Sequence, residues 1–436
     1  MSDQKSKSIP ISRTSRLVHL GGLASRVAGG MMAEGVRQLA SGKRPVGRDM
    51  LLTPANVNRV AEKLSHLRGA AMKVGQLLSM DAGDLLPPEL SILLARLRSS
   101  ATPMPMLQLA DVLENNLGAQ WQSQFQQFGF TPVAAASIGQ VHRAVDHQGR
   151  VLALKIQYPG ISQSIDSDVD NVVTLLRISR LLPDGMDITS LVKEAKQQLH
   201  AEADYHLEAE HLAEYGRLLA GEKGVRVPQF VPELSTGQVL AMSFEEGVSL
   251  DEAVDLSAEA RHTIARQMLA LLFRELFEFG RVQTDPNFAN YFYDHSTAEL
   301  VLLDFGATRI YTARLSAAYR TLFTAGIEGD RDGMLSAARE IGYFSQDVTQ
   351  EQMQTVMELF DLALEPLRAD SYDFASTDLA TRLRDKGMQL SMKQGYWHSP
   401  PVDALFLHRK LAGLYLLFAR LRVTLDCRSV LRPWVS

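Results

Sequence analysis

Two short acidic motifs in the second half of the chain carry the residue types that bind a divalent metal. The first, at residues 285–290, places Asn290 five positions after Asp285, and the second begins at Asp304 with the run Asp-Phe-Gly. Mg²⁺ prefers hard oxygen ligands and keeps several waters, so one carboxylate and one amide oxygen suffice when phosphates supply the rest. The motifs therefore predict that Asn290 and Asp304 hold magnesium beside a phosphorylated ligand.

The order and spacing of these motifs are typical of protein kinases. There a catalytic-loop Asp is followed by a metal-binding Asn at the same offset, and the Asp of Asp-Phe-Gly holds the metal that bridges the nucleotide phosphates. On this comparison Asp285 orients the attacking group, and the cofactors are ATP and Mg²⁺. The alternative is two ordinary acidic turns, because Asp-Phe-Gly alone is a weak signal.

Lys155 lies in the predicted strand 151–157, in which residues 151–154 and 156 are apolar, and this position is unfavourable unless the charge is compensated. A kinase carries a lysine on its third strand that pairs with the α- and β-phosphates, and we expect Lys155 to do the same. A charge on an edge strand is the alternative. Glu245 follows the predicted strand 238–244, where a kinase hinge meets adenine; an exposed linker acid explains it equally well.

The expected phosphate loop is rich in alanine instead of glycine. Its candidate nucleotide-binding residues are Ala135, Ala136, Ser137 and Gly139. Alanine restricts φ and carries a Cβ atom, so backbone amides approach phosphates less freely than in a glycine-rich turn. We expect this loop to hold the nucleotide differently from that of an ordinary kinase.

Apolar periodicity predicts the elements that must position these residues. Strands dominate before about residue 246 and helices after it, which favours an α+β, bilobal, protein-kinase-like fold with a helical N-terminal extension and a helix-rich C-lobe. The predicted parts are a basic leader (1–48), a helical extension (49–126), an N-lobe (127–246) and a C-lobe (247–436). The main predicted elements are a β-hairpin at 137–157, helices at 161–179, 188–219 and 257–279, and strands at 229–231, 238–244, 290–293 and 300–303.

Composition excludes several functional classes. The formal charge of −5 and the pI near 6.1 give no basic surface for nucleic acid. Cys427 is the single cysteine, so there is no internal disulfide framework and no cysteine-based metal site. No uncharged apolar run reaches the roughly 18 residues that a spanning helix requires. A protein without a transmembrane helix, soluble or peripheral, is expected.

The first fifty residues are basic, with nine Lys or Arg against three Asp or Glu. Leu17, Leu20, Leu23 and Val27 recur there at helical spacing, as in a helix lying on an anionic membrane surface. A tail without structure, or a helix packed on its own domain, is the alternative. The expected location is the cytoplasm or an organelle matrix, peripheral at the inner membrane.

From about Val60 to its end the sequence resembles the UbiB family of atypical kinases, which support ubiquinone biosynthesis. The resemblance rests on the alanine-rich loop, the motifs at 285–290 and 304–306, and two further motifs. These are Lys-Val-Gly-Gln at 73–76, for the family's Lys-x-Gly-Gln, and Glu-Ala-Asp at 202–204, for its Glu-x-Asp.

The resemblance implies that Glu208 is the helix glutamate that pairs with Lys155, and that Glu202 and Asp204 meet Lys73. On one helix at about 100° per residue, Glu202 and Glu208 face different neighbours, which agrees with two separate pairings. A solvated acidic helix face is the alternative.

The resemblance further implies that Lys73, Gly75 and Gln76 regulate the site, lying where a kinase would admit a peptide. A surface pair of Lys73 and Gln76 beside a packing glycine is the alternative. No His-Arg-Asp precedes the catalytic loop and no Ala-Pro-Glu follows Asp304, so protein substrates are disfavoured. The chain has Asn-Phe-Ala at 287–289 where many members have His-Pro-Gly, which leaves Asp285 and Asn290 intact.

The expected function is ATP hydrolysis, or phosphoryl transfer to a small or lipid-like acceptor, in support of ubiquinone biosynthesis. Expected partners are ATP or ADP, an anionic lipid surface, other proteins of the pathway and a second copy in a homodimer. A pseudokinase scaffold that nucleotide switches between conformations is the main alternative, and an ordinary protein kinase is a third.

Overall fold

The computed structural model describes residues 67, 69–71, 73–75, 103–136, 138–178, 188–285, 287–396, 398 and 400–435. These residues fall into two compact units, each described here by itself. The N-terminal unit holds the described chain up to Glu210 together with Phe230–Phe244, and the C-terminal unit holds His211–Gln229 and everything from Glu245 onward. The four-part division drawn from the sequence stays a prediction.

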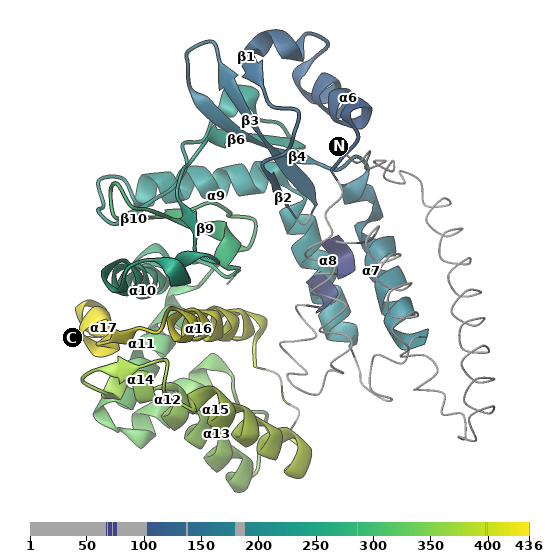
Figure 1. Ribbon diagram of the computed structural model, residues 1–436. Helices are drawn as coiled ribbons and strands as arrows, with labels where there is room; N and C mark the ends of the chain where they lie inside the picture. Colours follow the sequence, from purple (N-terminus) through teal and green to yellow (C-terminus); the bar gives the residue numbers. More distant parts are fainter. Residues whose placement is uncertain are drawn as a thin grey trace, which may run out of the picture. The chain divides into compact units, whose positions relative to one another are not determined.

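An antiparallel sheet forms the centre of the N-terminal unit (Figure 1). Its hydrogen-bonded order is β1-β3-β4-β6, with β2 paired to β3. The hairpin predicted from the alternating pattern is confirmed as β3 and β4. The strands are β1 (Phe125–Phe128), β2 (Ala134–Ala135), β3 (Gly139–Asp146), β4 (Val151–Gln157) and β6 (Val239–Ser243).

Helix α6 (Met106–Leu117) closes one side of the apolar core of this sheet. Leu109 and Leu113 are four residues apart, so they lie on one helix face, where both are fully buried against Leu154 and Ile156 of β4. Burying side chains of this size stabilises the unit by about 1.5–3 kcal/mol each. The helix is therefore part of the core that holds β4 in place.

Three helices follow the β3–β4 hairpin along the chain: α7 (Ile161–Ile178), α8 (Thr189–Glu202) and α9 (Tyr205–Leu218). The N-terminal unit contains α7, α8 and the first part of α9, up to Glu210. Helices α7 and α8 pack side by side (Figure 1). The single helix predicted over 188–219 is wrong, because the chain breaks after Glu202. There the Asp204 carboxylate accepts the backbone N–H groups of residues 206 and 207 at 3.1 and 3.2 Å and caps the start of α9.

Small sheets and short strands position the motifs of the C-terminal unit. One sheet has the order β5-β10-β9-β7, and β8 pairs with β11. The strands predicted at 290–293 and 300–303 are confirmed as β9 and β10. The strands are β5 (Val225–Arg226), β7 (Val248–Ser249), β8 (Arg281–Gln283), β9 (Tyr291–Asp294), β10 (Glu299–Leu302) and β11 (Thr308–Ile310).

The strand predicted at 229–231 is wrong. Phe230 forms only an isolated bridge with Met242, and the chain then enters a short 3₁₀ turn at Pro232–Leu234. Proline lacks an N–H group and has a fixed φ, so it suits the start of such a turn and cannot extend a hydrogen-bonded ladder.

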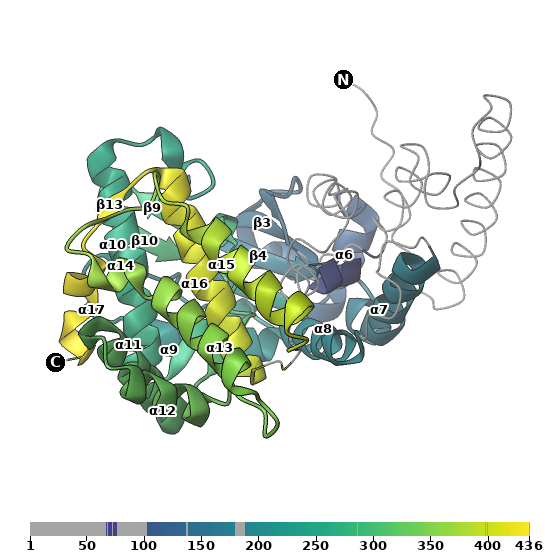
Figure 2. The same cartoon turned by 90° about the horizontal axis from the view of Figure 1, so that it is seen from below.

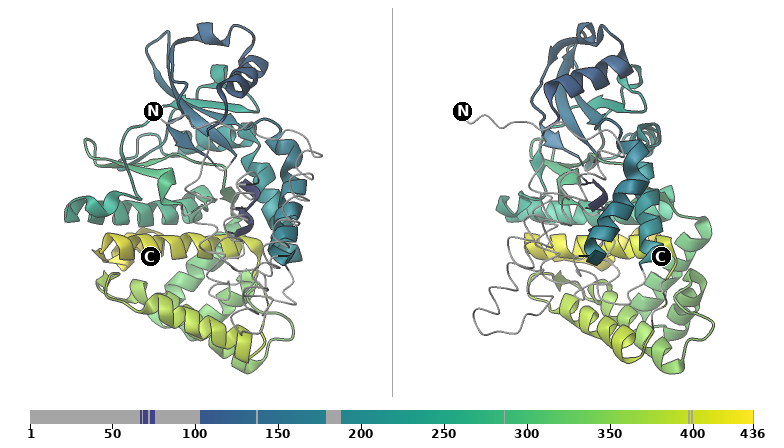
Figure 3. Two further views of the ribbon diagram at one scale, coloured as in Figure 1. Left: turned by 45° about the vertical axis from the view of Figure 1, so that its right-hand side comes forward. Right: turned by 90° about the vertical axis from the view of Figure 1, so that its right-hand side faces the viewer.

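Helices make up most of the C-terminal unit. The long predicted helix 257–279 is α10 (Ala258–Arg274), which continues into a π-helical turn at Glu275–Phe279. Helix α16 (Val402–Leu421) packs along α10, and its yellow ribbon is visible in Figure 3. The other helices, shown in Figure 2, are α11 (Ala313–Glu328), α12 (Arg331–Ile341), α13 (Gln350–Ala363), α14 (Glu365–Arg368), α15 (Leu379–Met388) and α17 (Cys427–Val435).

No helix in the described part of the chain is both long enough and apolar enough to span a bilayer. The predicted amphipathic leader lies outside the described residues.

Candidate functional site

Lys155 is buried in the middle of a sheet and paired with a helix carboxylate. Strand β4 is hydrogen-bonded to β3 on one side and to β6 on the other, so the edge-strand explanation of this lysine is wrong. The Lys155 Nζ lies 2.7 and 2.8 Å from the two carboxylate oxygens of Glu208, which is 1% exposed. The pairing implied by the resemblance is present, and the carboxylate supplies the charge compensation that a buried lysine requires.

Tyr205 is a neighbour of this pair that the sequence did not reveal. Its ring centroid lies 5.4 Å from the Lys155 Nζ, within the range of a cation–π contact. Tyr205 is the first residue of α9, so the break between α8 and α9 brings its ring against the strand lysine. Detecting it required knowing that the helix restarts at this residue.

The alanine-rich loop is the turn of the β2–β3 hairpin. Ala135 is exposed at the end of β2, and the Ala136 N–H donates to the Gly139 carbonyl at 2.9 Å. A Cβ atom at Gly139 would lie 2.3 Å from the Ile156 carbonyl oxygen, so only glycine fits this close approach to β4. Gly139 thus has a packing role independent of any ligand. Ser137 lies outside the described residues.

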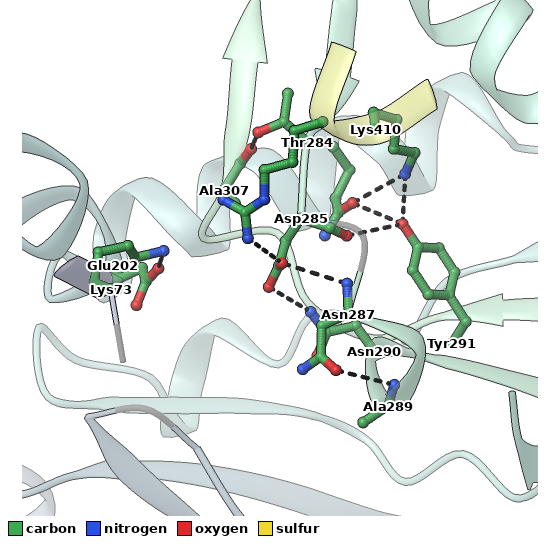
Figure 4. A network of polar contacts seen from close by, with 12 residues as sticks. Lys73, Glu202, Thr284, Asp285, Asn287, Ala289, Asn290, Tyr291, Ala307 and Lys410 are labelled. Carbon is green, nitrogen blue, oxygen red and sulfur yellow. Dashed lines mark hydrogen bonds and ion pairs between the residues drawn. The ribbon is translucent and has the colours of Figure 1, made fainter. Parts of the chain in front are cut away.

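Lys73 forms an ion pair with Glu202 at the end of α8 (Figure 4). The exposed fractions are 5% for Lys73 and 14% for Glu202, so the surface-pair explanation of Lys73 is wrong. Asp204 does not join this pair as the resemblance implied, because its carboxylate caps α9. Gly75 is buried, and Gln76 lies outside the described residues.

The Asp285 carboxylate is held by three hydrogen bonds (Figure 4). Its Oδ2 accepts from the Asn290 Nδ2 at 3.1 Å, and its Oδ1 accepts from the backbone N–H of Asn287 at 3.3 Å. Oδ1 also accepts from the Arg409 Nη2 at 3.0 Å. The Asn290 amide nitrogen is turned toward Asp285, and its Oδ1 accepts from the Asn287 Nδ2 at 3.5 Å. The Asn290 Oδ1 is the atom of this amide with the lone pairs to bind a cation.

Backbone hydrogen bonds hold the two acidic motifs together. The Thr284 N–H and hydroxyl both donate to the Ala307 carbonyl, at 3.1 and 2.8 Å, and the Leu303 N–H donates to the Asn290 carbonyl at 2.9 Å. The Asp304 Oδ1 accepts from the N–H of the glycine two residues later at 3.0 Å. The contact between Leu303 and Asn290 brings Asn290 beside the start of the Asp-Phe-Gly turn.

The donors near this turn suit magnesium better than a metal that needs a dense ligand cluster. Asn290 offers an amide oxygen and Asp304 a carboxylate, a set that Mg²⁺ completes with water and phosphate oxygens. Within the described ranges no group of three or more His, Cys, Asp or Glu side chains could hold a metal ion.

A buried polar network supports the catalytic loop from behind. Lys410 of α16 donates to the Gln283 Oε1 at 3.1 Å and to the Tyr291 hydroxyl at 2.5 Å (Figure 4). Glu275 accepts the Tyr215 hydroxyl at 2.7 Å and the Gln283 N–H at 3.1 Å. Burial raises the pKa of Glu275 and lowers the pKa of Lys410, and attraction between the two opposes both shifts.

Sequence reasoning missed this network and its neighbour Arg409. The available signal was the run His-Arg-Lys at 408–410, three consecutive basic side chains between the apolar runs 404–407 and 411–418. Charge at that density within an apolar stretch indicates buried polar partners, although it does not identify them.

Glu245 is held by an ion pair. The Arg226 guanidinium lies 3.1 Å from its carboxylate, and the same guanidinium binds Asp294 and Glu299, each at 2.9 Å. The exposed-linker explanation is therefore wrong, since Glu245 is only 14% exposed. Its predicted contact with adenine stays a prediction.

Comparison with known proteins places the chain among atypical kinases. The sequence model of the ABC1 atypical kinase-like domain matches residues 96–338. The protein named atypical kinase COQ8, mitochondrial, of Saccharomyces cerevisiae is 36% identical over 98% of this chain and 86% of its own length. Atypical kinase COQ8B, mitochondrial, of Rattus norvegicus is 38% identical over 99% of this chain and 83% of its own.

A solved structure supports the fold. The complex of Rv3197 with erythromycin from Mycobacterium tuberculosis superposes with a TM-score of 0.63, covering 94% of this chain and 98% of that one, at 22% identity. The predicted α+β, kinase-like fold is confirmed. The prediction of an atypical kinase of the phosphotransferase class is confirmed by the family model and the curated relatives. The chain belongs to the family of ABC1 atypical kinases, the UbiB family that its motifs resembled.

Proposed function

We propose that the chain binds Mg²⁺-ATP and either hydrolyses it or transfers its γ-phosphoryl group to a small or lipid-like acceptor. The observation that carries the proposal is the Lys155–Glu208 pair, a lysine placed inside a sheet and fixed by a helix carboxylate 53 residues away. A buried ion pair adds little net stability, so phosphate binding is a better reason for its presence than folding.

Each polar residue has a defined task in this proposal. Lys155 binds the α- and β-phosphates and Glu208 positions it. Asn290 and Asp304 hold the Mg²⁺, which when bound neutralises charge on the phosphate oxygens. Asp285 orients the water or hydroxyl that attacks, since its carboxylate is already fixed by three donors. Phosphoryl transfer leaves the protein little covalent work, so positioning and charge account for the catalysis.

The relatives suggest where this reaction acts. Those named above are mitochondrial atypical kinases, and the family resemblance connects them with ubiquinone biosynthesis. We propose the same pathway here, with an acceptor or partner at a membrane surface reached through the basic leader. Other proteins of the pathway are the proposed partners.

Phosphate release from ATP tests the enzymatic proposal. Purified protein is assayed with Mg²⁺, with and without anionic liposomes, beside Lys155→Ala and Asp304→Asn. Lys196→Ala and Asp251→Asn are matched controls because both residues form ion pairs away from the motifs. We expect both site variants to lose at least about 100-fold in turnover and both controls to stay within about twofold.

Two results would contradict the enzymatic proposal. Unchanged Mg²⁺-dependent turnover in Asp304→Asn would remove the metal assignment. Tight binding of Mg²⁺-ATP without any turnover in the wild type would select the nucleotide-switched scaffold instead.

A further inference from the structure

Arg409 reaches the catalytic loop from a helix more than a hundred residues downstream. Its Nη2 lies 3.0 Å from the Asp285 Oδ1. The other described donors to this carboxylate, Asn287 and Asn290, belong to the loop itself. Arg409 is therefore the one contact, among the residues the structure describes, that ties the Asp285 side chain to another element.

The burial of this contact distinguishes it from an ordinary surface ion pair. The exposed fractions are 9% for the Arg409 side chain and 17% for Asp285. A guanidinium so far removed from water needs a compensating charge, which Asp285 supplies. Arginine has five N–H donors. Since its hydrogen bond within the described chain goes to Asp285, the group retains donors for the oxygens of a ligand.

The next residue on the helix fixes the position of Arg409. Lys410 is 1% exposed and binds Gln283, which precedes the catalytic loop, and Tyr291, which follows it (Figure 4). Consecutive helical residues point about 100° apart, so Lys410 can hold the flanks of the loop while Arg409 holds its carboxylate. The helix cannot slide or rotate without breaking both sets of bonds.

Charge explains why a cation is useful at this position. Residues 285–290 contain no basic side chain, while Asp285 and Asp304 both bring negative charge. The γ-phosphoryl group in transfer carries further negative charge on its oxygens, and a planar guanidinium matches both carboxylate and phosphate geometry.

We propose that Arg409 is a positioning residue for phosphoryl transfer, holding the Asp285 carboxylate toward the acceptor and supplying the positive charge that the loop lacks. In the step, the acceptor oxygen bonds to the γ-phosphorus as the bond to the β–γ bridging oxygen breaks. ADP leaves with that electron pair, and the proton of the acceptor passes to Asp285 and then to water. This inference rests on the proposed function.

Steady-state kinetics with Mg²⁺-ATP test the inference. Arg409→Ala should lower kcat by about 100-fold and change the KM for Mg²⁺-ATP by less than about threefold, because binding of the ground state does not need the oriented carboxylate. Arg409→Lys keeps the charge without the planar geometry, and its kcat should be about tenfold higher than that of Arg409→Ala. Added guanidinium salt at millimolar concentration should partly restore Arg409→Ala but not Arg409→Lys.

Arg420→Ala is the matched control, since Arg420 lies on the same helix and pairs with Asp251 while 46% exposed. It should keep kcat within about twofold. In an Asp285→Asn background, Arg409→Ala should lower kcat little further, because the two residues act as a unit. Circular dichroism and thermal unfolding identify any variant that does not fold. If Arg409→Ala does not fold, the kcat of Arg409→Lys is compared with that of the wild type instead.

Three outcomes would overturn the inference, and they are distinguishable. Normal kcat in Arg409→Ala with active wild type contradicts the role of Arg409 alone. A double variant whose fold-decrease in kcat equals the product of the two single-variant decreases also contradicts it, because the residues would then act independently. No turnover in the wild type contradicts the proposed function and the inference together.

Discussion

At the residue scale, each of the two units holds charges that are kept away from water and compensated by specific partners. Lys155 has Glu208, Lys73 has Glu202, and Asp285 has Arg409. The first pair could be anticipated from the motifs and the family resemblance, because its members stand in recognisable contexts. Arg409 could not, because nothing local to a helix shows which loop it will meet.

The Lys155–Glu208 pair gives a stability prediction. Glu208→Gln leaves a buried lysine charge without its counter-charge, so the N-terminal unit should lose about 3 kcal/mol of unfolding free energy. Adding Lys155→Met to that variant should recover most of the loss, because an apolar side chain of similar length suits the interior of the sheet. Urea denaturation measures both values. A double variant no more stable than Glu208→Gln would show that the unpaired charge was not the cause.

His408 gives a prediction of pH dependence. Burial lowers its pKa from 6.5 to about 4, and its ring is hydrogen-bonded to Tyr343. Between pH 6.5 and 4 the His408 imidazole is protonated in the unfolded chain but neutral in the folded protein. The free energy of unfolding is therefore highest above pH 6.5 and decreases as the pH falls toward 4. Over that window the free energy of unfolding falls by about 3 kcal/mol, at about 1.4 kcal/mol per pKa unit. His408→Gln should therefore lose less stability than the wild type between pH 6.5 and 4.5 in urea denaturation, and identical pH profiles would contradict the burial argument.

At the element scale, short-range signals decided where the elements begin and end. The hairpin of β3 and β4 and the helices α7 and α10 follow their apolar periodicity closely. The break between α8 and α9 did not show in that periodicity, because helical spacing continues across it. The usable signal was Asp204, a residue type that caps helices, standing just before a new helical turn.

Substitution of Asp204 tests whether it acts as a cap or in regulation. Asp204→Ala should lower the unfolding free energy by about 1 kcal/mol through loss of two hydrogen bonds to α9, with nucleotide affinity changed less than about threefold. Asp330→Ala, which removes the cap of α12 in the same way, is the matched control for stability. A large change in ATP binding at unchanged stability would return Asp204 to the regulatory group that the resemblance implied.

At the scale of the whole molecule, the family and the fold class could be predicted from sequence because the motifs occur in a fixed order along the chain. The supporting network of Glu275, Gln283, Tyr291 and Lys410 could not, since it joins residues more than a hundred positions apart. The spacing of the motifs predicts which side chains contact a ligand. The packing that holds them is encoded in long-range contacts that no spacing reveals.

The basic leader gives a prediction for the molecule at a membrane. Deleting residues 1–45 should weaken sedimentation with anionic vesicles, and added salt should weaken binding of the full chain because surface charges are screened over about 8–10 Å. Neutral vesicles are the control. Equal binding with and without the leader would show that another surface contacts the lipid.

Equilibrium binding of ATP with and without Mg²⁺ tests the central claim most directly. Titration calorimetry should show that removal of Mg²⁺ by a chelator weakens ATP binding by at least about tenfold, or 1.4 kcal/mol. Asp304→Asn should lose that dependence on magnesium, and Lys155→Ala should bind weakly in either condition. Equal affinity of the wild type with and without Mg²⁺, or an Asp304→Asn protein that keeps the full magnesium dependence, would contradict the account.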